Sequence, residues 1–245
     1  MSRKTSLLFI GVGIACLIGI VYAMLNYPSQ GATILGWALF LGQLAYSYSE
    51  RLYWLLQSVK CYAVNPETQW SLSVRYSLDD WDETTMAAVR HALGTAAVRD
   101  RPTIRDLSSH RFEIRADELT MEVVTSHDEG CYLEVFFEKL PVSFRGSEKA
   151  MSERIRPALE SLEGKIRART KQYHLTVYFG KLNPYFGLYM RRLRQEDISL
   201  MTIKVTNHPE GMLDISKEKI SIYTSSLGRL DDSVKKYLTL SELPA

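Results

Sequence analysis

The chain has 245 residues, of which 46% are hydrophobic and 24% are charged. This composition is typical of a globular protein and excludes a disordered one, and the length suits one large domain or two small ones. Because 30 basic residues nearly balance 28 acidic ones, the overall field does not recruit nucleic acid, and we expect no nucleic-acid partner.

Two apolar runs near the N-terminus predict a transmembrane hairpin in residues 1–60. The first run, residues 7–25, carries no charge and no proline, and a helix of that length rises about 28 Å, close to the hydrocarbon thickness of a bilayer. A second uncharged run covers about residues 33–49, and LYWLLQSV could extend its helix to residue 59. A cleaved signal peptide is the alternative for the first run, but the run is too long for one and a second apolar run follows.

The flanking charges predict the orientation of this hairpin. Arg3 and Lys4 precede the first run, Arg51 and Lys60 follow the second, and the loop between the runs is uncharged. The positive-inside rule therefore predicts a two-pass protein of the inner membrane with both termini in the cytoplasm. Neither run contains an ionisable residue, which argues against a transporter.

Small residues recur at intervals of four in both runs. They are Gly11, Ala15, Gly19 and Ala23 in the first run, and Ala38 and Gly42 in the second. Such spacing places them on one stripe of a helix, where a neighbouring backbone can approach closely. Two interpretations stay open: the two spans pack on each other within one hairpin, or several chains assemble into a homo-oligomer.

The rest of the chain predicts two consecutive α+β repeats, residues 62–170 and 171–245, on the cytosolic side. The first repeat is read from alternating strands and amphipathic helices. Its elements are a strand at 70–78, a helix at 82–97, two strands around a turn near Ala116–Asp117, a strand from Cys131, and a helix at 147–169 kinked at Pro157.

The second repeat follows the same order of elements. Its elements are a strand at 173–180, a helix opened by Asn183 and Pro184, the strand SLMTIKVT, the hairpin MLDIS/KISIYTS, and the closing helix DDSVKKYLTL. The predicted fold class is α+β: a transmembrane hairpin followed by a duplicated β-α-β(3-4)-α domain with an antiparallel sheet. This order looks like the topology of TATA-binding protein, a likeness of fold that does not imply DNA binding.

Two similar heptapeptides support the duplication. VTSHDEG at 124–130 and VTNHPEG at 205–211 agree at five of seven positions, with an offset of 81, and each follows a predicted strand. We interpret both as hairpin turns, because HPEG suits a type I turn that ends in a left-handed glycine. The alternative is a paired site built on His127 and His208. No HxH or HExxH spacing supports a metal there, and we predict none.

The segment KLNPYFGLYMRRLRQ at 181–195 is the strongest ligand-binding candidate. It places Tyr185 and Tyr189 beside Arg191, Arg192 and Arg194. Aromatic rings stack on nucleobases and guanidinium groups hold phosphates. The alternative is an amphipathic helix whose arginines are solvated.

Catalytic signatures are absent from the sequence, which has no phosphate loop, GxSxG or HExxH motif. Three widely spaced cysteines, without a CxxC pair, indicate neither a disulfide framework nor a zinc site. We therefore predict a protein that is not an enzyme and needs no cofactor.

The uncharged two-span hairpin followed by a cytosolic domain resembles, as architecture over residues 1–60, the two-helix membrane effectors of bacterial cyclic-nucleotide anti-phage systems. The resemblance implies a membrane-anchored sensor or effector in antiviral defence, whose cytosolic domain binds a nucleotide signal or a protein partner and couples it to assembly of the spans. The alternative is a membrane-tethered, non-enzymatic scaffold of a multiprotein complex.

Overall fold

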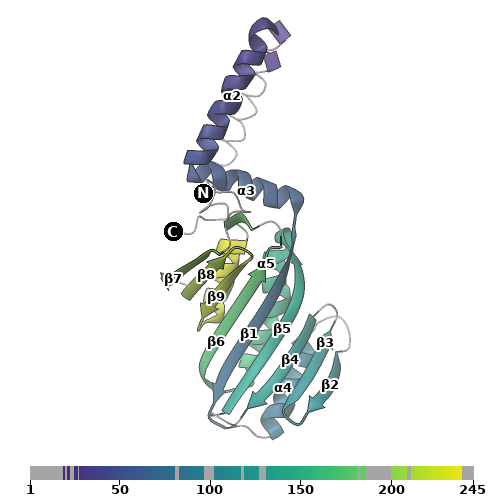
Figure 1. The fold of residues 1–245 in the computed structure, drawn as a ribbon. Coiled ribbons are helices and arrows are strands. Elements are labelled where there is room, and N and C mark those ends of the chain that lie inside the picture. Colours follow the sequence, from purple (N-terminus) through teal and green to yellow (C-terminus); the bar gives the residue numbers. More distant parts are fainter. Residues whose placement is uncertain are drawn as a thin grey trace.

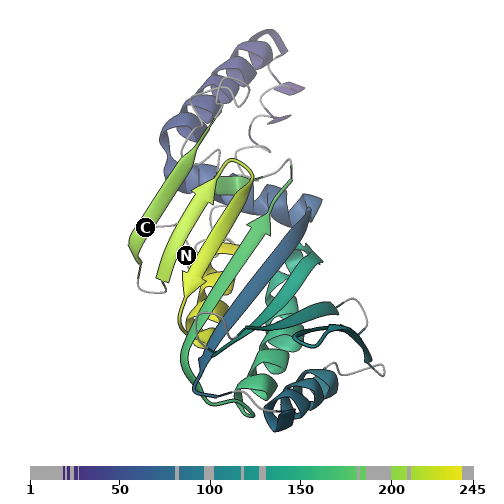
Figure 2. The same ribbon diagram turned by 60° about the horizontal axis from the view of Figure 1, so that its bottom comes forward.

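A nine-stranded antiparallel sheet forms the centre of the molecule (Figures 1 and 2). The computed structural model describes residues 19, 21–22, 25–26, 28–80, 83–96, 102–116, 119–126, 131–180, 183–185, 200–208 and 211–238. The strand order across the sheet is β2-β3-β4-β5-β1-β6-β9-β8-β7. The predicted α+β class with an antiparallel sheet is confirmed.

The strands alternate buried and more exposed side chains, as expected where one face of a sheet is covered. In β1, every second residue from Thr68 to Leu78 is buried. The strands of the first half are β1 (Glu67–Leu78), β2 (Thr103–Ser108), β3 (Arg111–Ala116), β4 (Leu119–Ser126) and β5 (Cys131–Ser143). Those of the second half are β6 (Ala168–Tyr178), β7 (Thr202–His208), β8 (Gly211–Ser216) and β9 (Lys219–Thr224).

The helices of both halves lie on one face of this sheet (Figures 1 and 2). They are α4 (Glu83–Ala96), the continuous run α5 (Ser147–Lys149), η2 (Ala150–Ile155) and α6 (Arg156–Glu163), and the run α8 (Leu227–Ser233) and η4 (Val234–Leu238). A π-helical segment, η2, precedes Pro157 where we predicted a kink. The wider turn accommodates the proline ring, which would otherwise clash with the carbonyl group one turn earlier.

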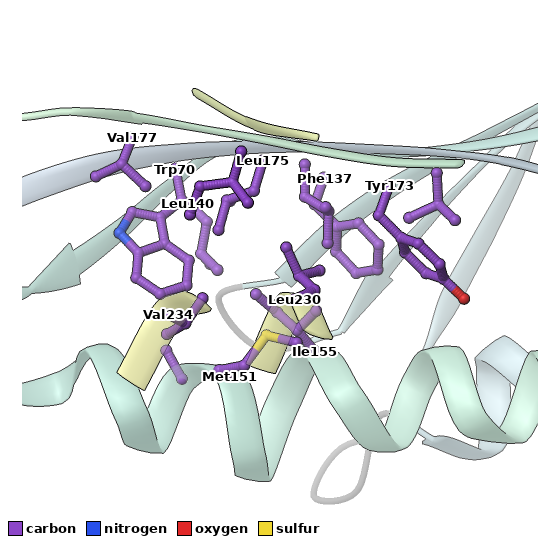
Figure 3. Close-up of a cluster of buried hydrophobic side chains, with 14 of the residues drawn as sticks. Trp70, Phe137, Leu140, Met151, Ile155, Tyr173, Leu175, Val177, Leu230 and Val234 are labelled. Atoms are coloured by element: carbon purple, nitrogen blue, oxygen red, sulfur yellow. The ribbon is translucent and has the colours of Figure 1, made fainter. Parts of the chain in front are cut away.

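The main core lies between the sheet and these helices (Figure 3). Trp70, Phe137 and Tyr173 point from the sheet toward the helices, and Met151 and Leu230 point back from the helices; all five are buried. This packing leaves the opposite face of the sheet free of helices within the described residues.

The two halves extend outward from the central strands β1 and β6. The first continues as β5, β4, β3 and β2, and the second as β9, β8 and β7. VTSHDEG joins β5 to β4, the first and second strands from the centre, whereas VTNHPEG joins β8 to β7, the second and third. Both heptapeptides therefore join neighbouring antiparallel strands, but they do not occupy equivalent positions, and the offset of 81 does not relate the strands that they join.

Helix α2 (Pro28–Tyr48) corrects the membrane prediction. Among the described residues, no helix is at once long enough and apolar enough to cross a bilayer. In α2, Gln30 and Gln43 bound a less polar stretch, residues 31–42, which rises only about 18 Å against a hydrocarbon core of roughly 30 Å. The predicted transmembrane hairpin, and the two-pass inner-membrane location with both termini in the cytoplasm, are therefore wrong. Most of the first predicted span lies outside the described residues.

Helix α3 (Glu50–Val64) is a separate element and not the extension of α2 to residue 59 that the sequence allowed. Ser49 adopts an extended conformation, and its Oγ accepts a hydrogen bond from the Leu52 amide at 3.2 Å. This serine cap starts a new helix. Figure 1 shows α3 across one end of the sheet and α2 projecting away from it. The Tyr53 hydroxyl donates to the Pro184 carbonyl at 3.2 Å, which ties α3 to the second half.

Candidate functional site

Tyr185, the first predicted ligand residue, belongs to the core. Its side chain is fully buried, and its ring lies 5.4 Å from that of Trp54 and 6.0 Å from that of Phe179. Its hydroxyl donates to the Tyr237 carbonyl. These contacts give Tyr185 a packing role between α3 and the C-terminal helix.

The other predicted site residues are not brought together by the described part of the structure. Tyr189, Arg191, Arg192, Arg194 and His127 lie outside the described residues. His208 ends β7, where its backbone pairs with Gly211. Of the small residues spaced four apart, Gly11, Ala15 and Ala23 also lie outside the described residues. Ala38 is half-buried. A Cβ added at Gly19 or Gly42 would meet no atom within 4 Å.

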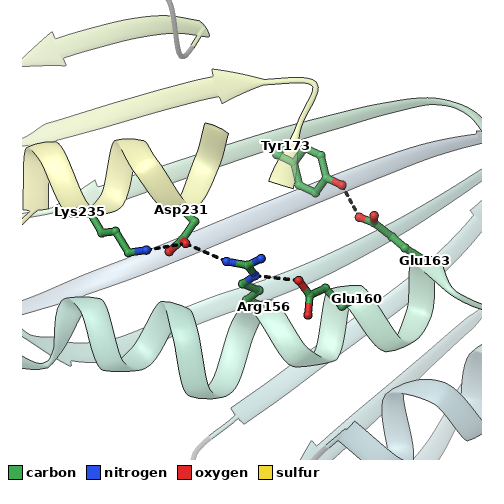
Figure 4. A network of polar contacts seen from close by, with 6 residues as sticks. All are labelled: Arg156, Glu160, Glu163, Tyr173, Asp231 and Lys235. Atoms are coloured by element: carbon green, nitrogen blue, oxygen red, sulfur yellow. Dashed lines mark hydrogen bonds and ion pairs between the residues drawn. The ribbon is translucent and has the colours of Figure 1, made fainter. Parts of the chain in front are cut away.

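One polar network ties together the helices of the two halves (Figure 4). Asp231 of α8, only 3% exposed, accepts hydrogen bonds from Arg156 Nη1 at 3.0 Å and from Lys235 Nζ at 2.9 Å. Arg156 also pairs with Glu160 at 2.7 Å. A buried carboxylate held by two cations is a structural link between α6 and α8.

A second network surrounds Glu163 at the end of α6. Its Oε1 accepts from the hydroxyls of Tyr76, at 3.2 Å, and Tyr173, and its Oε2 accepts from Lys171 Nζ at 2.6 Å. Burial is the largest cause that raises the pKa of both tyrosines far above the ordinary range. Both hydroxyls therefore stay protonated and donate, and the carboxylate is satisfied at both oxygens. This network also stabilises the fold.

On the helix-free face, the first half carries cross-strand ion pairs. Arg75 Nε lies 3.3 Å from Glu134 Oε1, and Arg111 Nε lies 2.5 Å from Glu122 Oε1. The Arg75 guanidinium also lies 3.9 Å from the centroid of the Tyr132 ring. These charges compensate one another across neighbouring strands, as is usual on a solvated sheet face.

The second half carries a row of hydroxyl and imidazole groups on the same face. Thr176 Oγ1 of β6 lies 3.1 Å from His174 Nε2 and 3.1 Å from Ser221 Oγ of β9. Thr176 is 6% exposed and Ser221 is 4% exposed. His174 stacks on Tyr223 of β9, with ring centroids 4.1 Å apart and ring planes 14° apart. We call His174, Thr176, Ser221, Tyr223 and Asp214 the polar row.

Asp214 ends the polar row on β8. The strand register places it directly opposite Ser221. Its Oδ1 is buried and has no hydrogen-bond partner among the residues that the structure describes. Leaving such an acceptor unsatisfied costs about 1–3 kcal/mol.

His174 is neutral near pH 7. Burial is the main cause that lowers its pKa, and the nearby Lys219 lowers it further. The neutral ring has one donor and one acceptor nitrogen, so the hydroxyls of Thr176 and Ser221 can orient in either direction along the row. In both directions the buried Asp214 Oδ1 lacks a partner within the described part of the chain.

The polar row was not predicted, because its members come from three strands. His174 and Thr176 are the polar alternates of YHLTVY, and Ser221 and Tyr223 are those of KISIYT. Such alternation indicates only that one face of each strand is more polar. The register of β6, β9 and β8 brings the residues together, and a single sequence does not state that register.

The comparisons with known proteins do not assign this chain to a family. No family model and no curated protein matches the sequence. A solved structure that matches is the AdoMetDC-delta26 monomer of Trypanosoma brucei, at 9% identity and a TM-score of 0.29. The match covers 65% of this chain and 65% of that chain, less than two thirds of either. At this TM-score the likeness carries no argument about the present protein.

Proposed function

We propose that this chain is a non-enzymatic sensor that binds a small ligand over β6, β9 and β8, on the helix-free face. The observation that carries the proposal is the polar row itself, in which imidazole, hydroxyl and carboxylate groups from three strands lie together on this face. Small-molecule sites contain a few polar groups that hydrogen-bond to the ligand.

Binding fits the polar row better than catalysis. In a hydrolase triad the nucleophile bonds directly to the imidazole, and a carboxylate orients that ring from behind. Here Ser221 reaches His174 through the Thr176 hydroxyl, and the carboxylate of Asp214 stands beside Ser221. The row therefore offers hydrogen-bonding groups without an activated nucleophile.

The test is a thermal-shift series on the full chain. The compounds are the four ribonucleoside monophosphates, cyclic AMP, cyclic GMP, arginine and lysine, each at millimolar concentration. A ligand at a hundred times its Kd stabilises the folded state by about 2.7 kcal/mol, which raises the Tm of a chain of this size by roughly 5–10 °C. We expect at least one compound to give such a shift.

Two matched variants locate the effect. Thr176→Val removes the central hydroxyl of the row at nearly constant volume, and Thr170→Val makes the same change at an exposed position of β6. We expect Thr176→Val to abolish the ligand-induced shift and Thr170→Val to keep it. Absence of a shift with every compound, or equal shifts in both variants, would overturn the proposal.

A second candidate function, a scaffold, is supported by the surface of α2. Trp37 is 62% exposed, Leu39 65% and Phe40 54%, and Trp37 and Phe40 form an edge-to-face pair with centroids 6.0 Å apart. Exposed apolar surface of this kind marks an interaction site. Gly36 and Gly42 of the same helix have open space where a side chain would stand. Because the same helix carries exposed rings and glycines beside which another chain has room to pack, we propose a second copy of this chain as the partner.

Sedimentation velocity of the full chain tests the scaffold. We expect a dimer or larger species at micromolar concentration, and a monomer for the double variant Trp37→Gln, Phe40→Gln. The exposed Tyr62→Gln in α3 serves as the control and should leave the mass unchanged. A monomeric wild-type chain, or an unchanged mass in the double variant, would rule this candidate out.

A further inference from the structure

Helix α3 is apolar on both of its long sides. Its inward side packs against the rest of the molecule through the buried Tyr53, Trp54 and Cys61. Its outward side, one helix face by the three- and four-residue spacing, carries only aliphatic and aromatic side chains: Leu52, Leu55, Leu56, Val59, Tyr62 and Ala63. A helix that is apolar all round is normally enclosed on every side, so the outward side of α3 is the surface that a partner would cover.

The outward side of α3 is open to solvent rather than closed by another described element. Leu56 is 45% exposed, Val59 51% and Tyr62 63%. The polar Gln57 and Ser58, which a surface helix normally turns outward, are only half exposed and are used in hydrogen bonds to Tyr46 and to the Trp54 carbonyl. Apolar surface gathered along one face in this way marks an interaction site.

Cations flank this apolar surface. The exposed Arg51 and Lys60 lie one turn from its leucines, one at each margin of the outward side. The exposed Arg145 adds a third cation, with its guanidinium carbon 4.4 Å from the centroid of the Tyr62 ring. Glu50, the acid of α3, stands one turn before the buried residues of the inward side. The partner of this surface therefore has an apolar interior and a negatively charged rim.

An anionic lipid surface has both properties. The apolar side chains of an interfacial helix enter the boundary between headgroups and acyl chains by roughly 5–10 Å, and its cations contact the charged headgroups. Figure 1 places α3 across one end of the sheet, with α2 projecting to the same outward side. The less polar stretch of α2, residues 31–42, rises about 18 Å, so it enters a bilayer without crossing it. A fluid surface accommodates both helices, whereas a folded protein would need a groove shaped for two helices of different direction.

We infer that α3 lies along the surface of an anionic membrane, with its outward side at the headgroup boundary. Arg51, Lys60 and Arg145 contact the lipid headgroups, and the sheet stays on the aqueous side. The helix lies on the bilayer and does not cross it. Lipid binding at α3 is separate from ligand binding at the polar row, and either can fail without the other.

Flotation of the full chain with lipid vesicles tests this inference. One set of vesicles contains phosphatidylcholine alone, and the other also contains about 30% phosphatidylserine. We expect the chain to bind the mixed vesicles about tenfold or more tightly than the neutral ones. Binding to the mixed vesicles should weaken severalfold when the salt concentration rises from about 0.1 to 0.5 M, because salt screens the cations.

A matched pair of double variants locates the apolar contact. Leu56→Glu with Val59→Glu places two charges on the outward side of α3 and should weaken binding to the mixed vesicles about tenfold or more. Ile104→Glu with Leu107→Glu makes the same change on β2, where these residues are 41% and 43% exposed and lie away from α3 (Figure 1). We expect this control to bind within about twofold of the wild-type chain.

A second pair tests the cations with changes that keep α3 folded. Arg51→Gln with Lys60→Gln should weaken binding to the mixed vesicles about tenfold and leave binding to neutral vesicles unchanged. Lys165→Gln with Arg167→Gln removes two exposed cations between α6 and β6 and should change neither.

Three results would overturn the inference. The first is a wild-type chain that does not bind the mixed vesicles, and the second is equal binding by the α3 variants and their controls. The third is unchanged vesicle binding by the α3 variants together with a lower mass in sedimentation velocity, because the outward side of α3 would then contact a second copy of the chain.

Discussion

Gly211 shows how a single residue shapes the polar row. Its φ is +136°, a conformation that side chains rarely adopt, and a Cβ added there would collide with the backbone carbonyl of Tyr223. The absence of a side chain lets β8 approach β9 closely at the level of the stacked ring. The sequence already indicated a left-handed glycine at the end of HPEG, although the close approach to β9 could not be seen there.

We therefore expect Gly211→Ala to lower the free energy of unfolding by about 1–3 kcal/mol. Urea denaturation of the full chain measures this change. Gly228→Ala is the control, because its Cβ would meet only Ser226 Oγ, at 3.8 Å, and alanine at this helical position should be neutral or stabilise by up to about 1 kcal/mol. A loss at position 211 no greater than at position 228 would contradict the geometry.

Tyr76 and Tyr173 make stability depend on pH in alkali. Their folded-state pKa values are raised, first by burial and then by neighbouring groups that include Glu163, whereas the unfolded value is near 10. The unfolded chain therefore loses these protons first, so the stabilisation is complete below about pH 10 and falls as pH rises above it. The slope reaches roughly 1.4 kcal/mol per pH unit for each tyrosine.

Urea denaturation at several pH values between about 9 and 11 checks this slope. The double variant Tyr76→Phe, Tyr173→Phe removes both titrating groups and should show a much flatter dependence, whatever its stability at neutral pH. Equal slopes for the variant and the wild-type chain would show that these hydroxyls do not titrate as described.

At the scale of elements, a charged hydrogen bond links α6 and α8 of the two helical runs. Asp231 is buried and accepts hydrogen bonds from Arg156 and Lys235. We expect Asp231→Asn to lower the free energy of unfolding by about 1–3 kcal/mol, because it leaves two cations without their shared anion. Asp232→Asn, an exposed neighbour on the same helix, should change it by less than about 0.5 kcal/mol. If urea denaturation gave similar losses of unfolding free energy for both variants, Asp231 would not link the two helices as described.

The elements themselves were largely predictable, for reasons that differ along the chain. Residues 82–97 were predicted as an amphipathic helix, and α4 covers Glu83–Ala96, because its apolar residues follow the helical period. The strand β2 (Thr103–Ser108) was missed, since all six of its residues are exposed and its apolar Ile104 and Leu107 do not alternate. An edge strand that contributes nothing to the core has no burial pattern to read.

At the scale of the whole molecule, the sequence predicted the order of elements along the chain but not their positions in the fold. Apolar composition alone suggested that residues 33–49 cross a membrane, whereas α2 is interrupted by glutamines and ends at the Ser49 cap. The matching heptapeptides suggested equivalent positions, whereas the sheet order sets them one strand apart. The polar row depends on pairing between residues up to 49 positions apart, from His174 to Tyr223. Such pairing follows from tertiary packing rather than from local pattern.

The imidazole of His174 reports most directly on the central claim, that the helix-free face of the second half binds a ligand. The measurement is the ¹H–¹³C spectrum of the histidine rings in the full chain during titration with the nucleotide that stabilises it most, with the His174 signal assigned by its loss in His174→Gln. We predict a saturable shift of the His174 signal and no shift of His91, which is exposed on α4 among the helices of the other face. An unmoved His174 signal at saturating nucleotide, or an equal shift of His91, would contradict the claim.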